Sequence, residues 1–182
     1  PGNSTQFDIA HITEVLAEAG DKLAPLLVHP VRRRVLLHRH IGFATHVPVN
    51  DRVASILARI PELTLVEGPA VPGHMCSSLG GVPGALKGPL TETWQSAVAA
   101  SSDALATIFH SCHREVAALD GRDGIAVRNW VHLVAEAMGL DAGDAYRGWR
   151  QGEAPDAAAI ARADPRLYAR LVEPELKKPL PI

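Results

Sequence analysis

The sequence predicts an α/β protein with a parallel sheet of about four strands, helices on both faces of the sheet, and a helical, proline-punctuated C-terminal extension. Short apolar runs rich in leucine and β-branched residues alternate with longer segments of helical periodicity over residues 7–140. Strands that alternate with helices form parallel sheets joined by right-handed crossovers. Apolar residues make up 47% of the 182 residues and charged residues 21%, which is typical of a globular protein with its own core.

The expected strands and helices follow from local patterns in order along the chain. Apolar runs place strands at residues 35–38, 63–66, 104–109 and 124–127. Helical spacing of apolar residues places helices at residues 7–20, 49–60, 90–100, 112–119 and 129–138. The expected helix caps are Asp8, Asn50 or Asp51, Thr91 and Asn129, and the expected helix ends are at Gly20, Pro61 and Gly139. The glycine- and proline-rich residues 68–88 are expected to form an irregular loop.

The pattern changes at about residue 141, which predicts two parts. Residues 1–140 are expected to form a single α/β module. Residues 141–182 are expected to form short helices punctuated by five prolines: Pro155, Pro165, Pro174, Pro179 and Pro181. This extension is expected to pack on the outside of the module or to contact a partner protein.

Bulk properties exclude several classes of protein. The net charge of −2 argues against nucleic acid as a partner, since binding to phosphates requires a basic surface. No apolar segment approaches the ~20 residues that a membrane span requires. Two cysteines are too few for a disulfide-rich secreted scaffold, so a reducing, cytoplasmic setting is expected.

Histidine and cysteine residues follow three of the four expected strands. The first strand ends at His38 and His40, the second leads to His74 and Cys76, and the third leads to His110, Cys112 and His113. The carboxyl ends of parallel strands line the ligand crevice of an open α/β sheet, so these residues are expected to meet there. Two thiolates and two imidazoles form the tetrahedral ligand set of structural zinc. The sequence therefore predicts a single metal ion, zinc first and iron second, with ligands drawn from Cys76, Cys112, His38, His40, His74, His110 and His113.

Two further roles for these segments remain open at this point. Cys112 lies at the start of an expected helix, where a thiol is readily ionised, so it could act as a nucleophile with His110 or His113 as base and no metal. Gly80 and Gly81 could allow the backbone to approach a cofactor, and Ser77 could donate a hydrogen bond to it.

The cysteine motifs resemble those of the cysteine-rich CCG domain, which occurs in heterodisulfide reductases and in the iron–sulfur subunits of glycolate oxidases. That family has a cysteine after a strand ending in histidine, then Cys-Cys-Gly-x-Gly-Gly, then Cys-x-x-Cys. The matching segments here are His38-Arg39-His40-Ile41, Cys76-Ser77-Ser78-Leu79-Gly80-Gly81 and Phe109-His110-Ser111-Cys112. The resemblance extends over about residues 7–140.

The resemblance implies a module of a redox complex that handles thiols or disulfides, with another subunit or domain as its partner. Five cysteines of the family hold a [4Fe–4S] cluster or, in some modules, a zinc ion. Only Cys76 and Cys112 are present here, and Ile41 and Phe109 offer no donor, so a cluster is not expected. The resemblance therefore favours a metal-binding module of a heterodisulfide reductase-like oxidoreductase. The alternative is a degenerate, non-catalytic assembly subunit.

Overall fold

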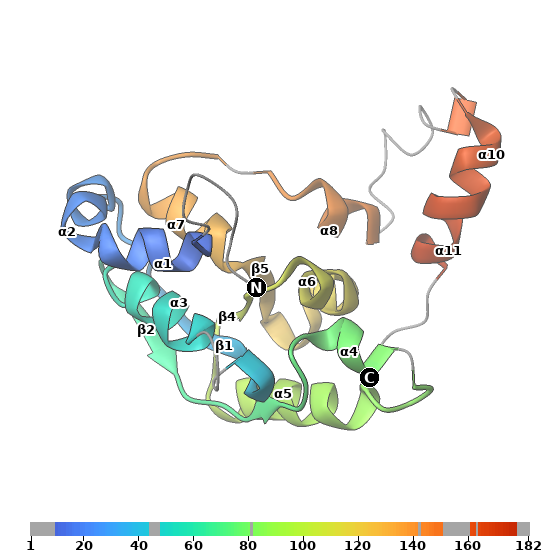
Figure 1. The fold of residues 1–182 in the computed structure, drawn as a ribbon, viewed down its shortest axis with the longest axis horizontal. Helices are drawn as coiled ribbons and strands as arrows, with labels where there is room; N and C mark the ends of the chain where they lie inside the picture. Colours follow the sequence, from blue (N-terminus) through green and yellow to red (C-terminus); the bar gives the residue numbers. More distant parts are fainter. Residues whose placement is uncertain are drawn as a thin grey trace, which may run out of the picture.

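Five parallel strands form the sheet at the centre of the computed structural model (Figure 1). The structure describes residues 10–43, 48–80, 82–141, 143–150, 161–162 and 164–177. Across the sheet the order is β2 (Leu63–Val66), β1 (Arg33–His40), β4 (Ala104–Thr107) and β5 (Ala126–Asn129), while β3 (Ala70–Val71) pairs with the end of β1. The predicted fold class is confirmed, and the predicted strand at residues 63–66 has the bounds of β2.

The strand order reverses between β1 and β4. From β1 the chain moves outward to β2, then returns across β1 to β4 and continues to β5. In an open parallel sheet, the carboxyl ends of the two strands that flank such a reversal border the principal ligand crevice. In this protein that position lies beyond His38 and Thr107, which are paired at the end of the β1–β4 ladder.

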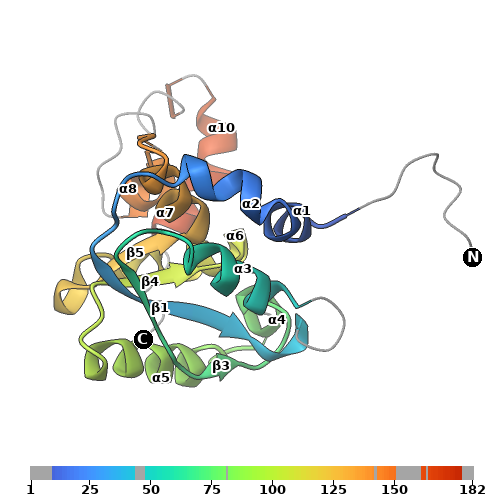
Figure 2. The ribbon, with the colours of Figure 1, turned by 90° about the vertical axis from the view of Figure 1, so that its left-hand side faces the viewer.

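Helices cover both faces of the sheet (Figure 2). One core contains Val35 and Leu37 of β1 and the apolar stripes of α3 (Val49–Leu57) and α7 (Trp130–Ala137). Leu23 of α2 (Gly20–Leu23) belongs to the same core, and α1 (Ile12–Glu18) packs against it. The other contains Leu36 of β1 and side chains of α4 (Cys76–Gly80), α5 (Lys87–Ala99) and α6 (His110–Val116). Neighbouring strand residues point to opposite faces, so Leu36 and Leu37 serve different cores.

Several details of the predicted helices are corrected by the structure. Thr91 does not cap α5, because the helix begins at Lys87 with Pro89 in its first turn, and the Thr91 hydroxyl donates to the Lys87 carbonyl. Neither Asn50 nor Asp51 caps α3, which begins at Val49 after Pro48. Asn129 caps α7 as predicted, by accepting a hydrogen bond from the Val131 amide. Asp8 lies outside the described residues.

The secondary structure of two segments differs from the prediction. The expected loop at residues 68–88 contains β3 and α4. The expected strand at residues 104–109 ends at Thr107, because the extended residue Phe109 is the N-cap of α6. Short 3-10 turns connect other elements, at Ala24–Leu26, Ile41–Phe43, Ala117–Leu119 and Arg122–Gly124.

The C-terminal region is helical, as predicted. It contains α8 (Ala145–Arg150), α10 (Pro165–Leu167), a π-helical turn at Tyr168–Val172 and α11 (Glu173–Leu176). Pro165 occupies the first position of α10, where proline is tolerated, and Asp164 caps that helix. Figure 1 shows α10 away from the sheet. Within the part of the chain that the structure describes, no helix is long and apolar enough to cross a bilayer.

Candidate metal centre

The last residues of β1 bring two histidines onto one face of the sheet. His38 and His40 are two residues apart in a strand, so both side chains point to the face that carries Leu36. Both residues are completely buried. Their rings are perpendicular, with centroids 4.9 Å apart. The two Nδ1 atoms make no hydrogen bond to any described residue, while both Nε2 atoms face sulfur.

Asn50 of α3 holds the backbone of His40. The His40 amide donates to Asn50 Oδ1 over 3.3 Å, and Asn50 Nδ2 donates to the His40 carbonyl over 2.7 Å. Asn50 is itself buried, so its amide replaces backbone partners that a neighbouring strand would supply. The sequence indicated Asn50 only as a helix cap. The signal that could have revealed its contact with the His40 backbone is the presence of a polar residue at the buried start of an amphipathic helix.

Replacement of Asn50 by alanine should weaken metal binding as well as the fold. The change leaves the buried His40 amide and carbonyl without these partners, at a cost of about 1–3 kcal/mol. Urea denaturation of the metal-free protein would measure this cost, and Co²⁺ titration would measure affinity. Asp51→Ala is the matched control, because Asp51 is exposed on the same turn of α3. Equal Co²⁺ affinity in both variants would contradict the role assigned to Asn50.

The two cysteines reach the same position from the second core. Cys76 is the first residue of α4, which follows β3 after a short turn at residues 72–75, and Cys112 lies in the first turn of α6, after β4. Both are free thiols with no exposed surface. The backbone amide of Cys76 donates to Cys112 Sγ over 3.3 Å, which fixes the start of α4 against α6.

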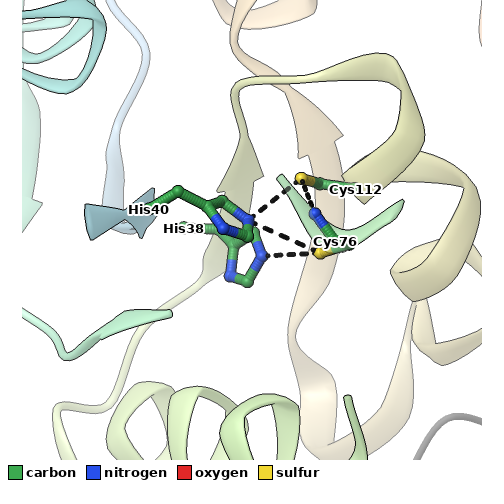
Figure 3. A group of neighbouring side chains, drawn as sticks. All are labelled: His38, His40, Cys76 and Cys112. Atoms are coloured by element: carbon green, nitrogen blue, oxygen red, sulfur yellow. Dashed lines mark hydrogen bonds between the residues drawn. The ribbon is translucent and has the colours of Figure 1, made fainter. Parts of the chain in front are cut away.

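Four donor atoms from these residues converge (Figure 3). His38 Nε2 lies 3.1 Å from Cys76 Sγ, and His40 Nε2 lies 3.6 Å from Cys76 Sγ and 3.2 Å from Cys112 Sγ. All four ligand atoms lie within 4.8 Å of one another. A tetrahedral zinc ion with bonds of about 2.3 Å to sulfur and about 2.0 Å to nitrogen separates its ligands by roughly 3.3–3.8 Å. The residues therefore form a group that could hold a single metal ion.

The surroundings of the two thiols favour one thiolate over two. The shared hydrogen bond with Cys76 lowers the pKa of Cys112, and hydrogen bonds from His38 and His40 lower it further, against the opposing effect of burial. The same shared hydrogen bond, followed by burial, raises the pKa of Cys76. The two pKa values are thus moved apart, which favours a single proton shared by the pair. A bound cation would displace this proton, because metal ligation requires thiolates.

The remaining predicted ligands lie outside this group. His74 and His110 are exposed, and His113 is buried but hydrogen-bonded elsewhere. The imidazole beside Cys112 belongs to His40 and not to His110, and the complete burial of the thiol leaves a substrate no direct access. Ser77 is exposed on α4, which ends at Gly80, and Gly81 lies outside the described residues.

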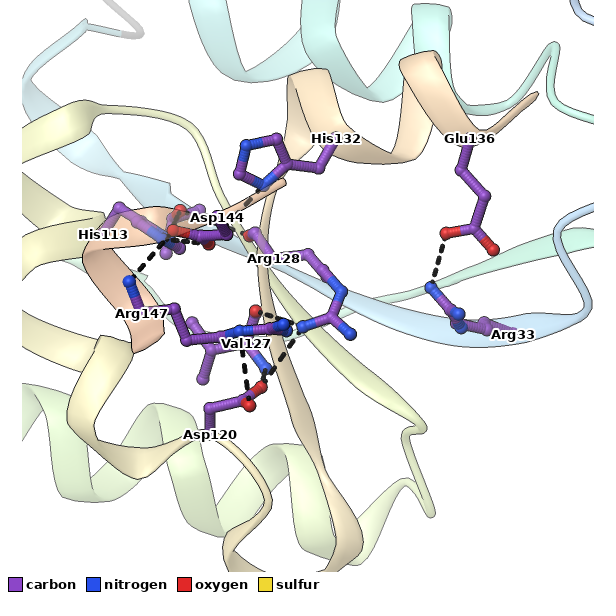
Figure 4. A network of polar contacts seen from close by, with 10 residues as sticks. Arg33, His113, Asp120, Val127, Arg128, His132, Glu136, Asp144 and Arg147 are labelled. Carbon is purple, nitrogen blue, oxygen red and sulfur yellow. Dashed lines mark hydrogen bonds and ion pairs between the residues drawn. The ribbon is translucent and has the colours of Figure 1, made fainter. Parts of the chain in front are cut away.

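His113 belongs to a separate polar cluster around Asp144 (Figure 4). His113 Nε2 donates to Asp144 Oδ2 over 2.8 Å, and the Thr107 hydroxyl lies 3.1 Å from His113 Nδ1. His132 Nδ1 lies 3.6 Å from the same carboxylate, and burial lowers the pKa of His132. Burial opposes ionisation of Asp144, but the His113 hydrogen bond and the Arg147 amide outweigh it and lower the pKa of Asp144.

Replacement of Asp144 by asparagine should destabilise the protein at neutral pH. A carboxyl group with a lowered pKa contributes stability above its unfolded pKa of about 3.9, and this contribution is lost as pH falls through the lower folded value. The expected cost is about 1–3 kcal/mol at pH 7, shrinking as the pH falls below about 4. Urea denaturation at pH 7 and pH 3 would measure it. Asp141→Asn, a change at an exposed residue of the same loop, should have little effect on stability. If the cost of Asp144→Asn were the same at pH 7 and pH 3, the ionised Asp144 carboxylate would not be the stabilising group.

The four residues that could hold a metal ion lie at the point where the strand order reverses. His38 and His40 are among the last residues of β1, and Cys112 follows β4, so the four donors lie together near the carboxyl ends of these two strands. Comparison of the chain with protein families, with curated proteins and with solved structures finds no match.

Proposed function

We propose that this chain is a mononuclear metal-binding module of a redox or thiol-handling complex, and that its ion is Zn²⁺. The observation that carries the proposal is the convergence of His38, His40, Cys76 and Cys112 with no exposed surface on any of them. Two thiolates and two imidazoles suit zinc better than magnesium or calcium, which prefer oxygen ligands. Iron is the second choice for the same ligand set.

A closed set of four protein ligands supports a structural role for the ion. Catalytic zinc sites keep one position for water or substrate, whereas structural sites fill all four with side chains. Here the ligands come from β1, α4 and α6, which are separated by long stretches of chain. A bound ion would supply positive charge that stabilises both thiolates. Its four ligands would link the carboxyl end of β1 to α4 and α6 on one face of the sheet.

The assignment to a redox or thiol-handling complex depends on the order of the motifs. His38 to Ile41, Cys76 to Gly81 and Phe109 to Cys112 follow one another as in the CCG domain. In this proposal, His38 and His40 take over ligand positions that the missing cysteines cannot fill. The ligand set requires reduced thiols, which favours a reducing, cytoplasmic setting.

Elemental analysis of the untagged protein tests the proposal. We expect close to one equivalent of zinc per chain, and none in Cys76→Ala, whereas His74→Ala, a change at an exposed histidine outside the group, should keep the full equivalent. A colourless protein excludes an iron–sulfur cluster. Less than a tenth of an equivalent in the wild-type protein after incubation with Zn²⁺ under reducing conditions would refute the proposal.

A second candidate function is assembly without metal chemistry. Leu167 and Leu171 are four residues apart in the C-terminal helical segment, and they are 41% and 54% exposed. Apolar side chains at this spacing form one stripe on a helix, which suits an apolar groove on another subunit of the complex. A subunit retained by the wild-type chain but lost by Leu167→Asp/Leu171→Asp would support this function. Retention by both that variant and the control Arg166→Ala/Arg170→Ala would argue against it.

A further inference from the structure

A pocket of about 420 Å³ lies beside the metal-binding group, at the carboxyl ends of β4 and β5. Four of the nine histidines of the chain line this pocket, namely His11, His110, His113 and His132. His11 caps α1, His110 and His113 belong to α6, and His132 lies in the first turn of α7, three helices that the fold brings together at this edge of the sheet. We call this cavity the histidine pocket.

Phe109 lies between the histidine pocket and His40 of the candidate metal-binding group, in contact with both. Its ring lines the pocket and also packs edge-on against His40, with centroids 6.1 Å apart and an interplanar angle of 66°. Phe109 is only partly buried, and it packs against both cores of the protein. Phe109 therefore contacts both the cavity and a residue of the buried group.

The chemistry of the histidine pocket suits a divalent transition-metal ion. Imidazole nitrogens are the protein ligands that zinc, copper, nickel and iron share. His110 is exposed at the pocket, while the carboxylate of Asp144 adds an oxygen donor and negative charge. His11 Nδ1 bonds to Thr13, which leaves its Nε2 for an ion. Ions that prefer oxygen ligands would gain less from this lining.

We infer that the histidine pocket is the loading site for the buried metal centre. This inference depends on the proposed function. A divalent transition-metal cation first binds to pocket imidazoles such as His110 and His132, and it passes to His40 when the Phe109 ring turns aside. On transfer, the bonds from the ion to the pocket imidazoles break, and bonds to the sulfur atoms and to His38 and His40 form. The proton shared by the two thiols leaves to water, and each imidazole carries its hydrogen on Nδ1 so that Nε2 is free to bind the ion.

Rates of Co²⁺ uptake by the metal-free full chain test the inference, because cobalt–thiolate absorption reports arrival at the cysteines. We expect Phe109→Ala to speed both uptake and chelator-driven release by about tenfold, with the dissociation constant nearly unchanged, since a lowered barrier acts on both directions. Phe109→Leu, which keeps more of the apolar volume, should give a smaller acceleration and serves if the alanine variant fails to fold.

Histidine variants distinguish binding of Co²⁺ in the pocket from its transfer past Phe109 to the cysteines. His110→Ala/His132→Ala should slow uptake at low Co²⁺ concentration by about tenfold, without changing the final stoichiometry. His29→Ala is the control, because His29 is exposed and does not line the pocket. Failure of the wild-type protein to bind Co²⁺ would refute the proposed function. Normal binding by the wild type, with rates in all pocket variants equal to those of His29→Ala, would refute the loading site alone.

Discussion

Replacement of Cys112 by serine is expected to abolish stoichiometric metal binding. In the presence of Zn²⁺, the variant should therefore melt at a lower temperature than the wild-type protein. Hydrogen bonds with Cys76, His38 and His40 lower the pKa of the Cys112 thiol, and its sulfur lies 3.2 Å from His40 Nε2. A serine hydroxyl does not ionise at neutral pH, so it is a poor replacement for a thiolate ligand. The three remaining donors would then hold the ion weakly, and the polar donors would stay buried without it.

The size of the stability change follows from linkage. A ligand that binds only the folded state stabilises it by about 4 kcal/mol when its free concentration is a thousand times the dissociation constant. For a chain of this length the corresponding shift in melting temperature is roughly 8–16 °C. Thermal unfolding followed by circular dichroism, with and without added Zn²⁺, would measure the difference between the wild type and Cys112→Ser.

Two controls distinguish loss of the ion from damage to the fold. Treatment of the wild-type protein with a chelator should bring its melting temperature close to that of Cys112→Ser. Ser111→Ala changes the neighbouring residue, whose hydroxyl forms no hydrogen bond with the described residues, and it should retain a full equivalent of zinc. A Cys112→Ser protein that still holds one equivalent of zinc would show that Cys112 is not a ligand.

The candidate metal-binding group was partly predictable because it depends on local order along the chain. Parallel strands bring their carboxyl ends together, so histidines and cysteines that follow β1, β2 and β4 had to approach one edge of the sheet. The pattern did not separate the four residues that converge from the three that do not. The two-residue period of a strand would have grouped His38 with His40, since both follow Leu36 on one face.

The partners of the site residues were not predictable in the same way. Asn50 lies ten residues after His40, and its local sequence indicates a helix cap, whereas its amide bonds to the end of a strand. His113 pairs with Asp144, which lies 31 residues later in a segment without strong periodicity. Such contacts depend on how helices pack on the sheet, and a single sequence does not encode them in any local pattern.

Leucine-to-alanine changes at two neighbouring positions of β1 should separate the stability of the sheet from the integrity of the metal centre. Leu36 and Leu37 are 0% and 1% exposed, and they point to opposite faces. Leu36 shares its core with Cys76 and Cys112, whereas Leu37 packs against the stripes of α3 and α7. Each change should cost about 2–5 kcal/mol, because each removes a buried side chain and leaves a cavity in a close-packed core.

Only Leu36→Ala is expected to weaken metal binding in the protein that remains folded. The cavity left by Leu36 lies in the core that positions both cysteines, so α4 and α6 can shift and move the donor atoms apart. The cavity left by Leu37 lies on the opposite face of the sheet, away from the cysteines. Urea denaturation of the metal-free proteins would give the two stability costs, and Co²⁺ titration at low temperature would give the affinities. Equal losses of affinity in the two variants would contradict the division of the fold into two cores, one of which holds the metal centre.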